Sequence, residues 1–240
     1  MKQAVIVAGG KGSRLLPYTA LLPKPLMPLG DRPVLELLLE GLRAAGITDV
    51  ILAVNHLGHL LEAFFGDGAR LGLSITYSVE DDELGTAGPL GLLLHRLEPN
   101  FVFANGDLLT TLDTAKMVIA HEALGADATI GSYRRVVRSE FGVLKVDSEM
   151  RLTAYQEKPE YEQLISMGLY VLRRDAIRPY LVPGSALDMP ALMENMRRDD
   201  LRIYCHGQDC IWLDIGCPQD FAEAQSLVLQ NRDAFSPVRK

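Results

Sequence analysis

Strand-like and helix-like patterns alternate along the first half of this chain, and that alternation limits the fold more than any other feature. Apolar runs at residues 4–7, 50–54 and 73–77 are typical of buried strands. Between them, residues 33–45 and 59–65 carry apolar side chains at helical spacing. Parallel strands need crossover connections, which are usually helices, so this rhythm predicts βαβ units around a parallel sheet.

The rest of the chain continues this pattern with one interruption. Further strands are predicted at 101–104, 128–133, 164–172 and 201–205, and further helices from Pro89 and at 114–123, 175–180, 187–198 and 220–231. Residues 141–155 instead predict two short antiparallel strands with a polar turn at 147–149. The expected fold class is α/β: a mostly parallel, Rossmann-like twisted sheet with helices on both faces and a small antiparallel sub-lobe.

Composition bounds the partners and the compartment. The 240 residues suffice for one α/β domain with its own core. The net charge of −7 argues against nucleic acid or an anionic membrane as a partner, because both need a basic surface. No apolar run approaches a membrane span, residues 1–3 lead straight into a strand rather than a signal-peptide core, and three cysteines suggest no disulfide framework. We therefore expect a cytoplasmic protein.

The segment after the first strand, residues 8–28 (AGGKGSRLLPYTALLPKPLMP), is here called the first loop. In an open α/β sheet, ligands bind at the carboxyl ends of the strands, where this loop begins. Its glycines let the backbone approach a polyanion, and successive N–H groups can form an anion-binding concavity. Lys11, Arg14 and Lys24 add positive charge. The first loop therefore predicts a site for a triphosphate rather than a plain tight turn.

Two better-known phosphate loops do not match. A P-loop requires a glycine where Val5 stands and a serine or threonine where Gly12 stands. A dinucleotide fingerprint requires a third glycine where Leu15 stands and an acid at the end of the second strand, which reads Ala53-Val54-Asn55-His56. These differences argue against a nicotinamide-dependent oxidoreductase, the main rival among α/β enzymes.

The stretch GGKGSRLLPYTALLPKPLMPLGDRP resembles the signature loop of the sugar-1-phosphate nucleotidyltransferases, also called nucleotide-sugar pyrophosphorylases. Within that family, the chain is similar to short mannose- and heptose-1-phosphate guanylyltransferases. The resemblance implies that a nucleoside triphosphate and a sugar 1-phosphate react, with Mg²⁺ as cofactor, to give a nucleotide sugar and pyrophosphate. It also implies catalytic roles for Arg14 and Lys24. The nucleotide-binding residues that it implies in this loop are Ala8, Gly9, Gly10, Lys11 and Gly12.

A second loop, residues 78–88, holds an acidic run that could be a plain surface loop before the helix at Pro89. The resemblance implies instead that Glu80 faces the nucleobase and that Gly85 and Thr86 bind the nucleotide. A carboxylate only accepts hydrogen bonds, which suits the adjacent N1–H and N2–H₂ donors of guanine. GTP is therefore favoured, and UTP, dTTP and CTP stay open as alternatives.

Asn105-Gly106-Asp107 follows the strand at 101–104 and could form an ordinary turn. Because it ends a buried strand, Asp107 is expected at the same sheet edge as the first loop, where it could hold Mg²⁺ against the phosphates. The resemblance implies that Asp107 and Asp214 are the two metal ligands and that Asn105 binds nucleotide. Two carboxylates on one Mg²⁺ is a suitable ligand count.

The run Gln156-Glu157-Lys158-Pro159 would by itself be an ordinary solvated charge pair. The resemblance implies that Glu157 binds sugar hydroxyls, that Lys158 binds the sugar phosphate and that Gly142 touches the sugar ring. Many family members have Asn-Ala-Gly in the next strand, where this chain has Ser166-Met167-Gly168. Mannose, heptose, glucose, amino-sugar and cyclitol phosphates all stay open as substrates.

The resemblance also implies one nucleotidyltransferase domain over residues 1–240, with 1–135 mainly binding nucleotide and 136–240 mainly binding sugar phosphate. The chain ends soon after the helix at 220–231, so we expect no appended β-helix or regulatory domain, and a monomer or homodimer. A non-catalytic regulatory homologue is the remaining rival. The presence of Arg14, Lys24, Asp107 and Asp214 argues against a regulatory homologue.

Overall fold

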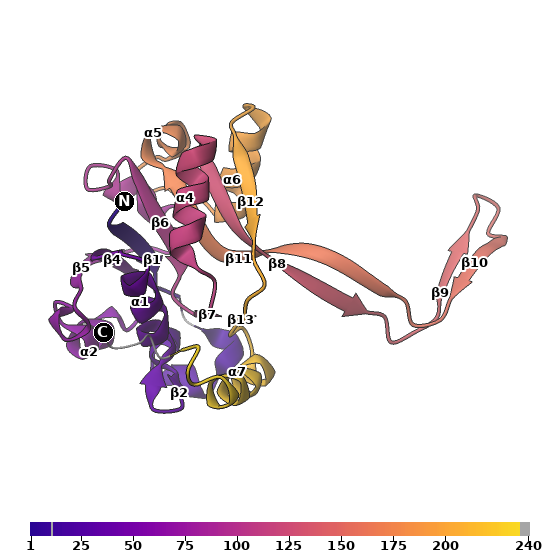
Figure 1. The fold of residues 1–240 in the computed structure, drawn as a ribbon, viewed down its shortest axis with the longest axis horizontal. Coiled ribbons are helices and arrows are strands. Elements are labelled where there is room, and N and C mark those ends of the chain that lie inside the picture. The colour runs from indigo at the N-terminus through magenta and orange to yellow at the C-terminus, as the bar shows by residue number, and fades with distance from the viewer. Residues whose placement is uncertain (11, 236–240) are drawn as a thin grey trace.

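Seven strands form one twisted sheet in the computed structural model, which describes residues 1–10 and 12–235 (Figure 1). Their order across the sheet is β12-β8-β11-β6-β1-β4-β5. All neighbouring strands are parallel except β11, which is antiparallel to β6 and to β8. The strands are β1 (Gln3–Val7), β4 (Asp49–Val54), β5 (Ser74–Val79), β6 (Asn100–Asn105), β8 (Ala128–Arg138), β11 (Glu160–Arg173) and β12 (Ile203–Gly207).

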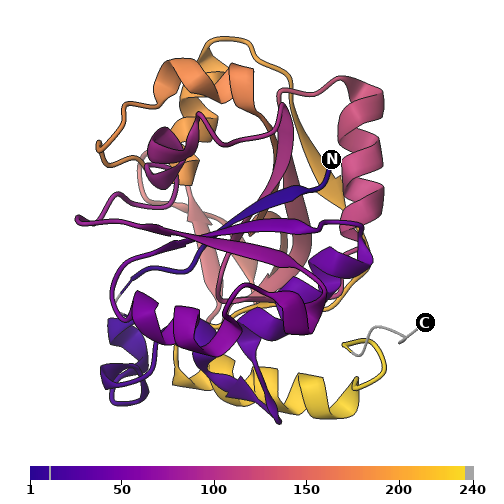
Figure 2. The same cartoon turned by 90° about the vertical axis from the view of Figure 1, so that its left-hand side faces the viewer.

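Helices cover both faces of this sheet because the buried strands point apolar side chains alternately to each face. In β1, Ala4 and Ile6 belong to one core cluster and Val5 to the other. The first cluster contains side chains of α1 (Val34–Ala44), α2 (Gly58–Phe65) and α4 (Thr114–Leu124). The second contains side chains of α3 (Pro89–Leu93), α5 (Arg174–Ile177) and α6 (Met189–Arg198). Figure 2 shows the twisted sheet between these helices. The predicted α/β class is confirmed.

A third apolar cluster lies beneath the first loop and fixes it to the last helix, α7 (Pro218–Gln230). Leu15 and Met27 of the loop are almost fully buried there against Ala224 and Val228 of α7. Two short hairpin strands, β2 (Pro28–Leu29) and β3 (Arg32–Pro33), end the loop. The loop that follows β1 is therefore packed at its far end rather than free.

The predicted elements are present, with three differences. The helix predicted at 175–180 is one α-turn, α5, followed by a 3₁₀ turn at Arg178–Tyr180. The helix from Pro89 is only five residues long. Four short strands were not predicted: the pair β2 and β3, and the pair β7 (Leu108–Thr110) and β13 (Trp212–Asp214). Strands of two or three residues are too short to show a hydrophobic period, so pattern reading does not find them.

The predicted antiparallel pair also exists, but it lies at the end of a long projection. Strands β8 and β11 continue past the sheet as a two-stranded ribbon, which ends in a hairpin of β9 (Val143–Val146) and β10 (Leu152–Gln156) (Figure 1). We call residues 134–164 the arm. Its turn forms as expected, because the Asp147 carboxylate accepts hydrogen bonds from the backbone N–H groups of Glu149 (2.9 Å) and Arg151 (3.0 Å). The sub-lobe is thus an extended arm.

Among the described helices, none is both long enough and apolar enough to span a bilayer.

Asp127 fastens three strands of the sheet, and its replacement by asparagine should destabilise the fold. The buried carboxylate forms ion pairs with Arg173 at the end of β11 and with Arg202 before β12. The backbone N–H of Arg202 also donates to this carboxylate at 2.8 Å. Losing these charged hydrogen bonds should lower the free energy of unfolding by about 2–3 kcal/mol. Urea denaturation measures this difference. Asp175→Asn is the control, because its pairs with Arg174 and Arg178 are exposed; an equal loss in both variants would contradict the prediction.

Candidate active site

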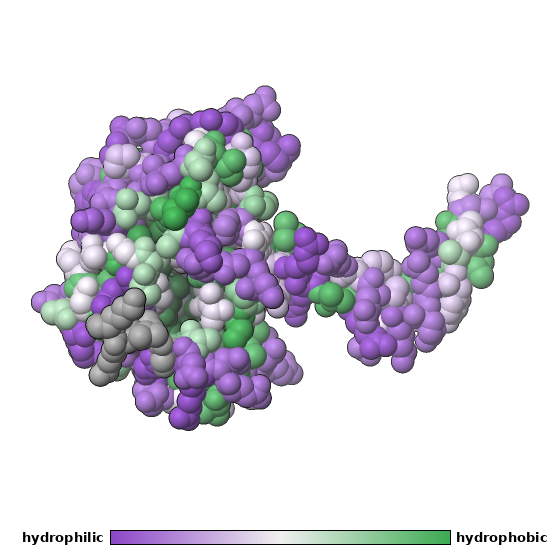
Figure 3. All heavy atoms as spheres, viewed as in Figure 1, coloured by the Kyte–Doolittle hydropathy of each residue, from purple (hydrophilic) through white to green (hydrophobic). Residues whose placement is uncertain are grey.

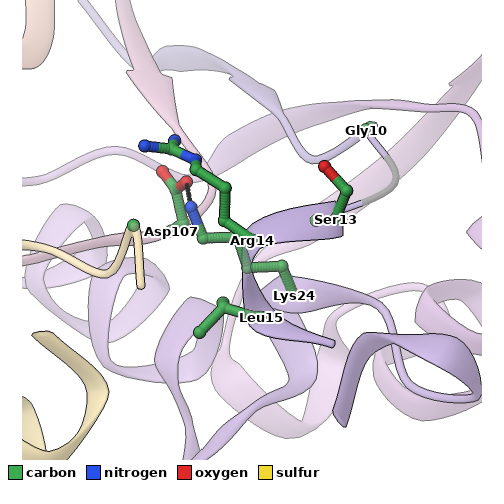
Figure 4. Close-up of a pocket in the computed structure, with 9 residues that line it drawn as sticks. Gly10, Ser13, Arg14, Leu15, Lys24 and Asp107 are labelled. Carbon is green, nitrogen blue, oxygen red and sulfur yellow. Dashed lines mark hydrogen bonds and ion pairs between the residues drawn. The ribbon is translucent and has the colours of Figure 1, made fainter. Parts of the chain in front are cut away.

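A hollow of about 240 Å³ opens at the carboxyl end of β1, and we call it the cradle (Figure 4). It is lined by Gly9, Gly10, Gly12, Ser13, Arg14, Leu15, Lys24, Asp107 and Gly216. Ligand pockets usually enclose about 300–1,000 Å³, so the cradle suits part of a nucleotide, such as its phosphate tail, better than a whole one. Ser13, Leu15 and Gly216 were not predicted, and no sequence signal distinguishes them from other loop residues.

Glycine is required where the first loop turns. Gly12 has a φ of +58°, and a Cβ at this position would lie only 2.9 Å from Cγ2 of Thr19. The carbonyl of Gly12 accepts hydrogen bonds from the Thr19 hydroxyl (2.8 Å) and from the backbone N–H of Leu15 (2.9 Å). These contacts hold the loop backbone in place beside the cradle. The predicted residue Lys11 lies outside the described residues.

Both described loop cations point toward Asp107 (Figure 4). The Lys24 ammonium forms an ion pair and a hydrogen bond with the Asp107 carboxylate. The Arg14 guanidinium is exposed and lies against Gly216, where an added Cβ would be 3.5 Å from its Nη1. An exposed guanidinium next to a lysine and to backbone without a Cβ is a suitable receptor for a phosphate group.

Asp214 reaches the same place through strand pairing. In the β7–β13 pair, Asp214 lies opposite Leu108, the residue after Asp107, and the Ile215 N–H donates to the Asp107 carbonyl at 3.4 Å. Partial burial, and then the charge of Asp107, raise the pKa of Asp214, whereas Lys24 and Arg14 lower it. The two aspartates and the two loop cations, which are far apart in sequence, therefore act on one another electrostatically.

This pair of carboxylates fits a magnesium ion. Mg²⁺ is commonly held by one or two carboxylates, with substrate phosphate oxygens and water completing its octahedron. In the described part of the chain, no group of three or more His, Cys, Asp or Glu side chains could hold a metal by itself. A further positive charge, beside those of Lys24 and Arg14, would also offset the repulsion from Asp107 that, after burial, raises the pKa of Asp214. Asp107 and Asp214 would hold such an ion only together with a substrate phosphate.

Glu80 follows β5 at the same sheet edge and is buried, not part of an exposed acidic loop. Its backbone N–H donates to the Val54 carbonyl at 2.9 Å, which continues the β4–β5 pairing. Burial raises the pKa of its carboxyl to about 7. Its Oε1 atom has no hydrogen-bond partner among the described residues. An unpartnered buried carboxyl oxygen is costly, and a ligand donor reaching it would remove that cost.

Gly85 and Thr86 are held by the start of α6. The Thr86 backbone N–H donates to Oδ1 of Asp188 at 3.1 Å, and the Thr86 hydroxyl accepts from the Met189 N–H at 2.7 Å. A Cβ at Gly85, whose φ is +72°, would lie 2.7 Å from the same carboxylate oxygen. These two residues fasten the second loop to the other half of the chain. Their predicted contacts with nucleotide stay predictions.

The other predicted nucleotide-binding residues reach the same edge. The Ala8 N–H donates to the Ala53 carbonyl at 2.8 Å, and a Cβ at Gly9 would lie 3.3 Å from Cβ of Asn55. Asn105 ends β6 opposite Val7, with its amide against Gly168 of β11. Gly10, with a φ of +103°, lines the cradle and faces open space. The strand ends of β1, β4 and β6 therefore form one continuous rim.

The three predicted sugar-phosphate residues lie elsewhere, on the arm. The Tyr155 hydroxyl donates to Oε2 of Glu157 at 3.2 Å, and Gly142 packs against both side chains. Lys158 follows with a φ of +43°. The structure thus brings Gly142 and Glu157 together, with Lys158 next in the chain, but the arm carries all three away from the cradle of their own chain (Figure 1).

Asp220 is a further residue at the site that was not singled out from the sequence. Its carboxylate accepts from the backbone N–H groups of Gly216 (3.0 Å) and Cys217 (2.8 Å) and so begins α7 beside the cradle. An acid three residues after a helix N-cap is the signal of a capping box. The spacing from Cys217 to Asp220 is visible in the sequence, so this residue could have been found there.

An open α/β sheet with a glycine-rich loop at its carboxyl edge and two acids beside it is an arrangement in which α/β proteins bind phosphate groups. Residues 3–231 match the sequence model of the family described as nucleotidyl transferase, and the chain belongs to that family. The family inferred from the first loop is confirmed.

Two relatives that are similar to this chain are named as sugar-1-phosphate nucleotidyltransferases. The chain is 35% identical over 232 residues to a mannose-1-phosphate guanylyltransferase of Mycobacterium tuberculosis, covering 93% of this chain and 63% of that protein. It is 33% identical over 241 residues to a UTP–glucose-1-phosphate uridylyltransferase of Synechocystis, covering 92% and 62%. The chain therefore spans less than two thirds of the length of these two relatives.

Solved structures share the fold. One is a putative glucose-1-phosphate thymidylyltransferase of Bacillus anthracis, with a TM-score of 0.76 and 25% identity over 94% of each chain. Another is HddC of Yersinia pseudotuberculosis, with a TM-score of 0.73 and 24% identity, covering 95% of this chain and 99% of that one.

Proposed function

We propose that this chain is a sugar-1-phosphate nucleotidyltransferase that converts a nucleoside triphosphate and a sugar 1-phosphate into a nucleotide sugar and pyrophosphate, with Mg²⁺ as cofactor. One observation carries the proposal: Arg14, Lys24 and Asp107 line the cradle, and the charges of all three act on Asp214. The names of the relatives in M. tuberculosis and Synechocystis support the same reaction class.

The chemistry needs no general base. A phosphate monoester has its second pKa near 6, so a sugar 1-phosphate is mostly dianionic at neutral pH and already nucleophilic. It attacks the α-phosphorus in line, and the bond to pyrophosphate breaks. Catalysis is then positioning and charge stabilisation. Arg14 neutralises the departing pyrophosphate and Lys24 binds the reacting phosphates. Asp107 and Asp214 would hold a Mg²⁺ ion, which would supply further charge neutralisation.

GTP is the proposed nucleotide, because Glu80, at the carboxyl edge of the sheet, has a buried acceptor oxygen with no partner among the described residues. Guanine has two adjacent donors for a carboxylate, whereas uracil and thymine have one donor between two acceptors. UTP, dTTP or CTP with another sugar or cyclitol phosphate is the alternative, and the name of the Synechocystis relative supports it. Residues 1–135 would mainly bind the nucleotide, and residues 136–240 would mainly bind the sugar phosphate. The proposed compartment of the protein is the cytoplasm.

The test is pyrophosphate release in a matrix of four nucleoside triphosphates against a panel of sugar 1-phosphates, with and without Mg²⁺. We expect release with GTP and at least one hexose or heptose 1-phosphate, and none without a divalent metal. Binding of nucleotide sugars without turnover of any substrate pair would instead show a regulatory protein.

Replacing Glu80 by glutamine should change base preference. Losing the paired contact to guanine should lower kcat/KM for GTP by about 10- to 100-fold, and the value for UTP should not fall. Steady-state kinetics with both nucleotides measure this. Asp82→Asn, a change in an exposed neighbour, is the control. An equal loss with GTP and UTP would remove Glu80 from base recognition.

The same carboxyl predicts a pH dependence. Its pKa of about 7 means that the ionised acceptor form increases as pH rises, so the wild-type KM for GTP should fall between pH 6 and 8, whereas that of Glu80→Gln should stay flat. Folding stability has the opposite sign. The folded pKa lies above the ordinary 4.5, so burial of the neutral carboxyl stabilises the fold at low pH, and this contribution is lost as pH rises through 7. Thermal unfolding should therefore favour Glu80→Gln over wild type more at pH 8 than at pH 5.

A further inference from the structure

The arm lacks the packing that a two-stranded structure needs. None of the side chains of residues 134–164, all of which the structure describes, is buried. At the tip, β9 and β10 pair with each other and, within the described chain, with no other strand. An isolated two-stranded hairpin is at best marginally stable in water. The arm therefore needs a surface to cover it.

Apolar side chains on the arm mark it as an interaction surface. Phe141 is 79% exposed and Met150 77% exposed, and Leu144, Leu152 and Val136 are also exposed. Figure 3 shows such apolar residues along the projection, among hydrophilic ones. Exposed apolar groups gathered on one element are typical of protein interfaces.

A matching apolar surface borders the cradle. Leu16 and Tyr18 of the first loop are each 56% exposed, and Leu21 is 84% exposed, although Leu15 of the same loop is fully buried. Val79, at the end of β5 beside Glu80, is 68% exposed. The carboxyl edge of the sheet thus presents apolar side chains next to the proposed site, while the apolar arm points away from it.

The arm also carries a second set of polar groups, separate from those of the cradle. The Tyr155 and Glu157 side chains meet beside Gly142, where an added Cβ would clash with the tyrosine hydroxyl, and Lys158 follows in the chain. Lys158 has a left-handed backbone, a strained conformation for a side-chain-bearing residue that is often found at ligand sites. A carboxylate for hydroxyl groups and an ammonium for a phosphate suit a phosphorylated polyol.

The arm holds these groups away from its own cradle (Figure 1). Its ribbon is paired from Arg134–Leu164 out to Arg138–Glu160, which is about 13 Å at roughly 3.3 Å per residue, and the hairpin lies beyond that. Placing these groups at the cradle of their own chain would require the ribbon to change direction from the one seen here. A second copy related by a twofold axis requires no such change, because each arm can reach the other copy.

We propose that the arm docks on a second copy of this chain and places Glu157 and Lys158 beside the cradle of that copy, so that each sugar-phosphate site is built from two chains. This inference rests on the proposed function. The apolar arm then covers the exposed side chains of the first loop, and the nucleotide end of each site comes from one chain and the sugar-phosphate end from the other.

The test combines two damaged chains. Arg14→Ala removes a cradle cation and Lys158→Ala removes an arm cation, so each variant alone should lose turnover. The two are produced together with different affinity tags, and the doubly tagged fraction is checked before assay. At random pairing, half of the dimers are mixed and each mixed dimer holds one intact site, so we expect recovery of about a quarter of wild-type turnover. Copurification without recovery, or no copurification, would overturn the proposal.

A second measurement does not depend on turnover. Phe141→Asp and Met150→Asp should convert a wild-type dimer to a monomer in sedimentation analysis, with an unchanged circular dichroism spectrum. Ile119→Asp is the control, because Ile119 is 64% exposed on α4, away from the arm. An arm-dependent dimer that turns over no substrate pair would leave the docking intact and refute the proposed function. A wild-type monomer with full turnover would refute the docking and leave the proposed function intact.

Discussion

Replacing Arg14 by alanine should lower turnover by about two to three orders of magnitude and leave the fold intact. The guanidinium is exposed, so its removal disturbs no core packing. It lies beside Gly216 and points, with Lys24, toward Asp107, where the leaving pyrophosphate would gather negative charge (Figure 4). Pyrophosphate release under substrate saturation measures the effect.

The comparison variant for Arg14 is Arg178→Ala, because Arg178 is also exposed but lies in the 3₁₀ turn after α5. It should keep wild-type turnover. Thermal unfolding of both variants checks that folding is unaffected. Near-normal turnover of Arg14→Ala would remove this residue from the mechanism and would leave Lys24 as the described loop cation that acts on phosphate.

Replacing Asp107 by asparagine should lower turnover by about two orders of magnitude and raise the magnesium concentration needed for half-maximal rate. An amide keeps the shape but loses the charge that Asp107 and Asp214 share at the cradle. Magnesium titrations of the rate measure both effects. Asp214→Asn should give the same pattern, and Asp175→Asn, on an exposed turn, should not.

Asp107 also pairs with Lys24, so the variant has a second explanation. If the carboxylate served only to position that lysine, turnover would fall without any change in the metal requirement. A shift in the magnesium titration therefore distinguishes a ligand from a positioning residue, and its absence would contradict the metal assignment.

Local features of the chain were predictable from the sequence because they depend on neighbouring residues. Hydrophobic period located the strands and helices, as in β1, where alternate residues face opposite cores. Gly12 and the cations of the first loop predict an anion-binding site from the sequence alone. Glu80 was different. Its acidic surroundings suggested an exposed loop equally well, and only packing shows that it is buried.

The sequence by itself determined the longer elements and the α/β class, and it predicts that the first loop binds an anion, since propensity, period and turn chemistry act over a few residues. Only the tertiary structure decided which distant residues meet. Pairing of β7 with β13 brings Asp214 close to Asp107. The Asp188 carboxylate accepts a hydrogen bond from the backbone N–H of Thr86. The ribbon of β8 and β11 carries Glu157 and Lys158 away from the cradle of their own chain. Such meetings depend on strand register and on the direction of long strands, and these are set by the packing of the whole chain.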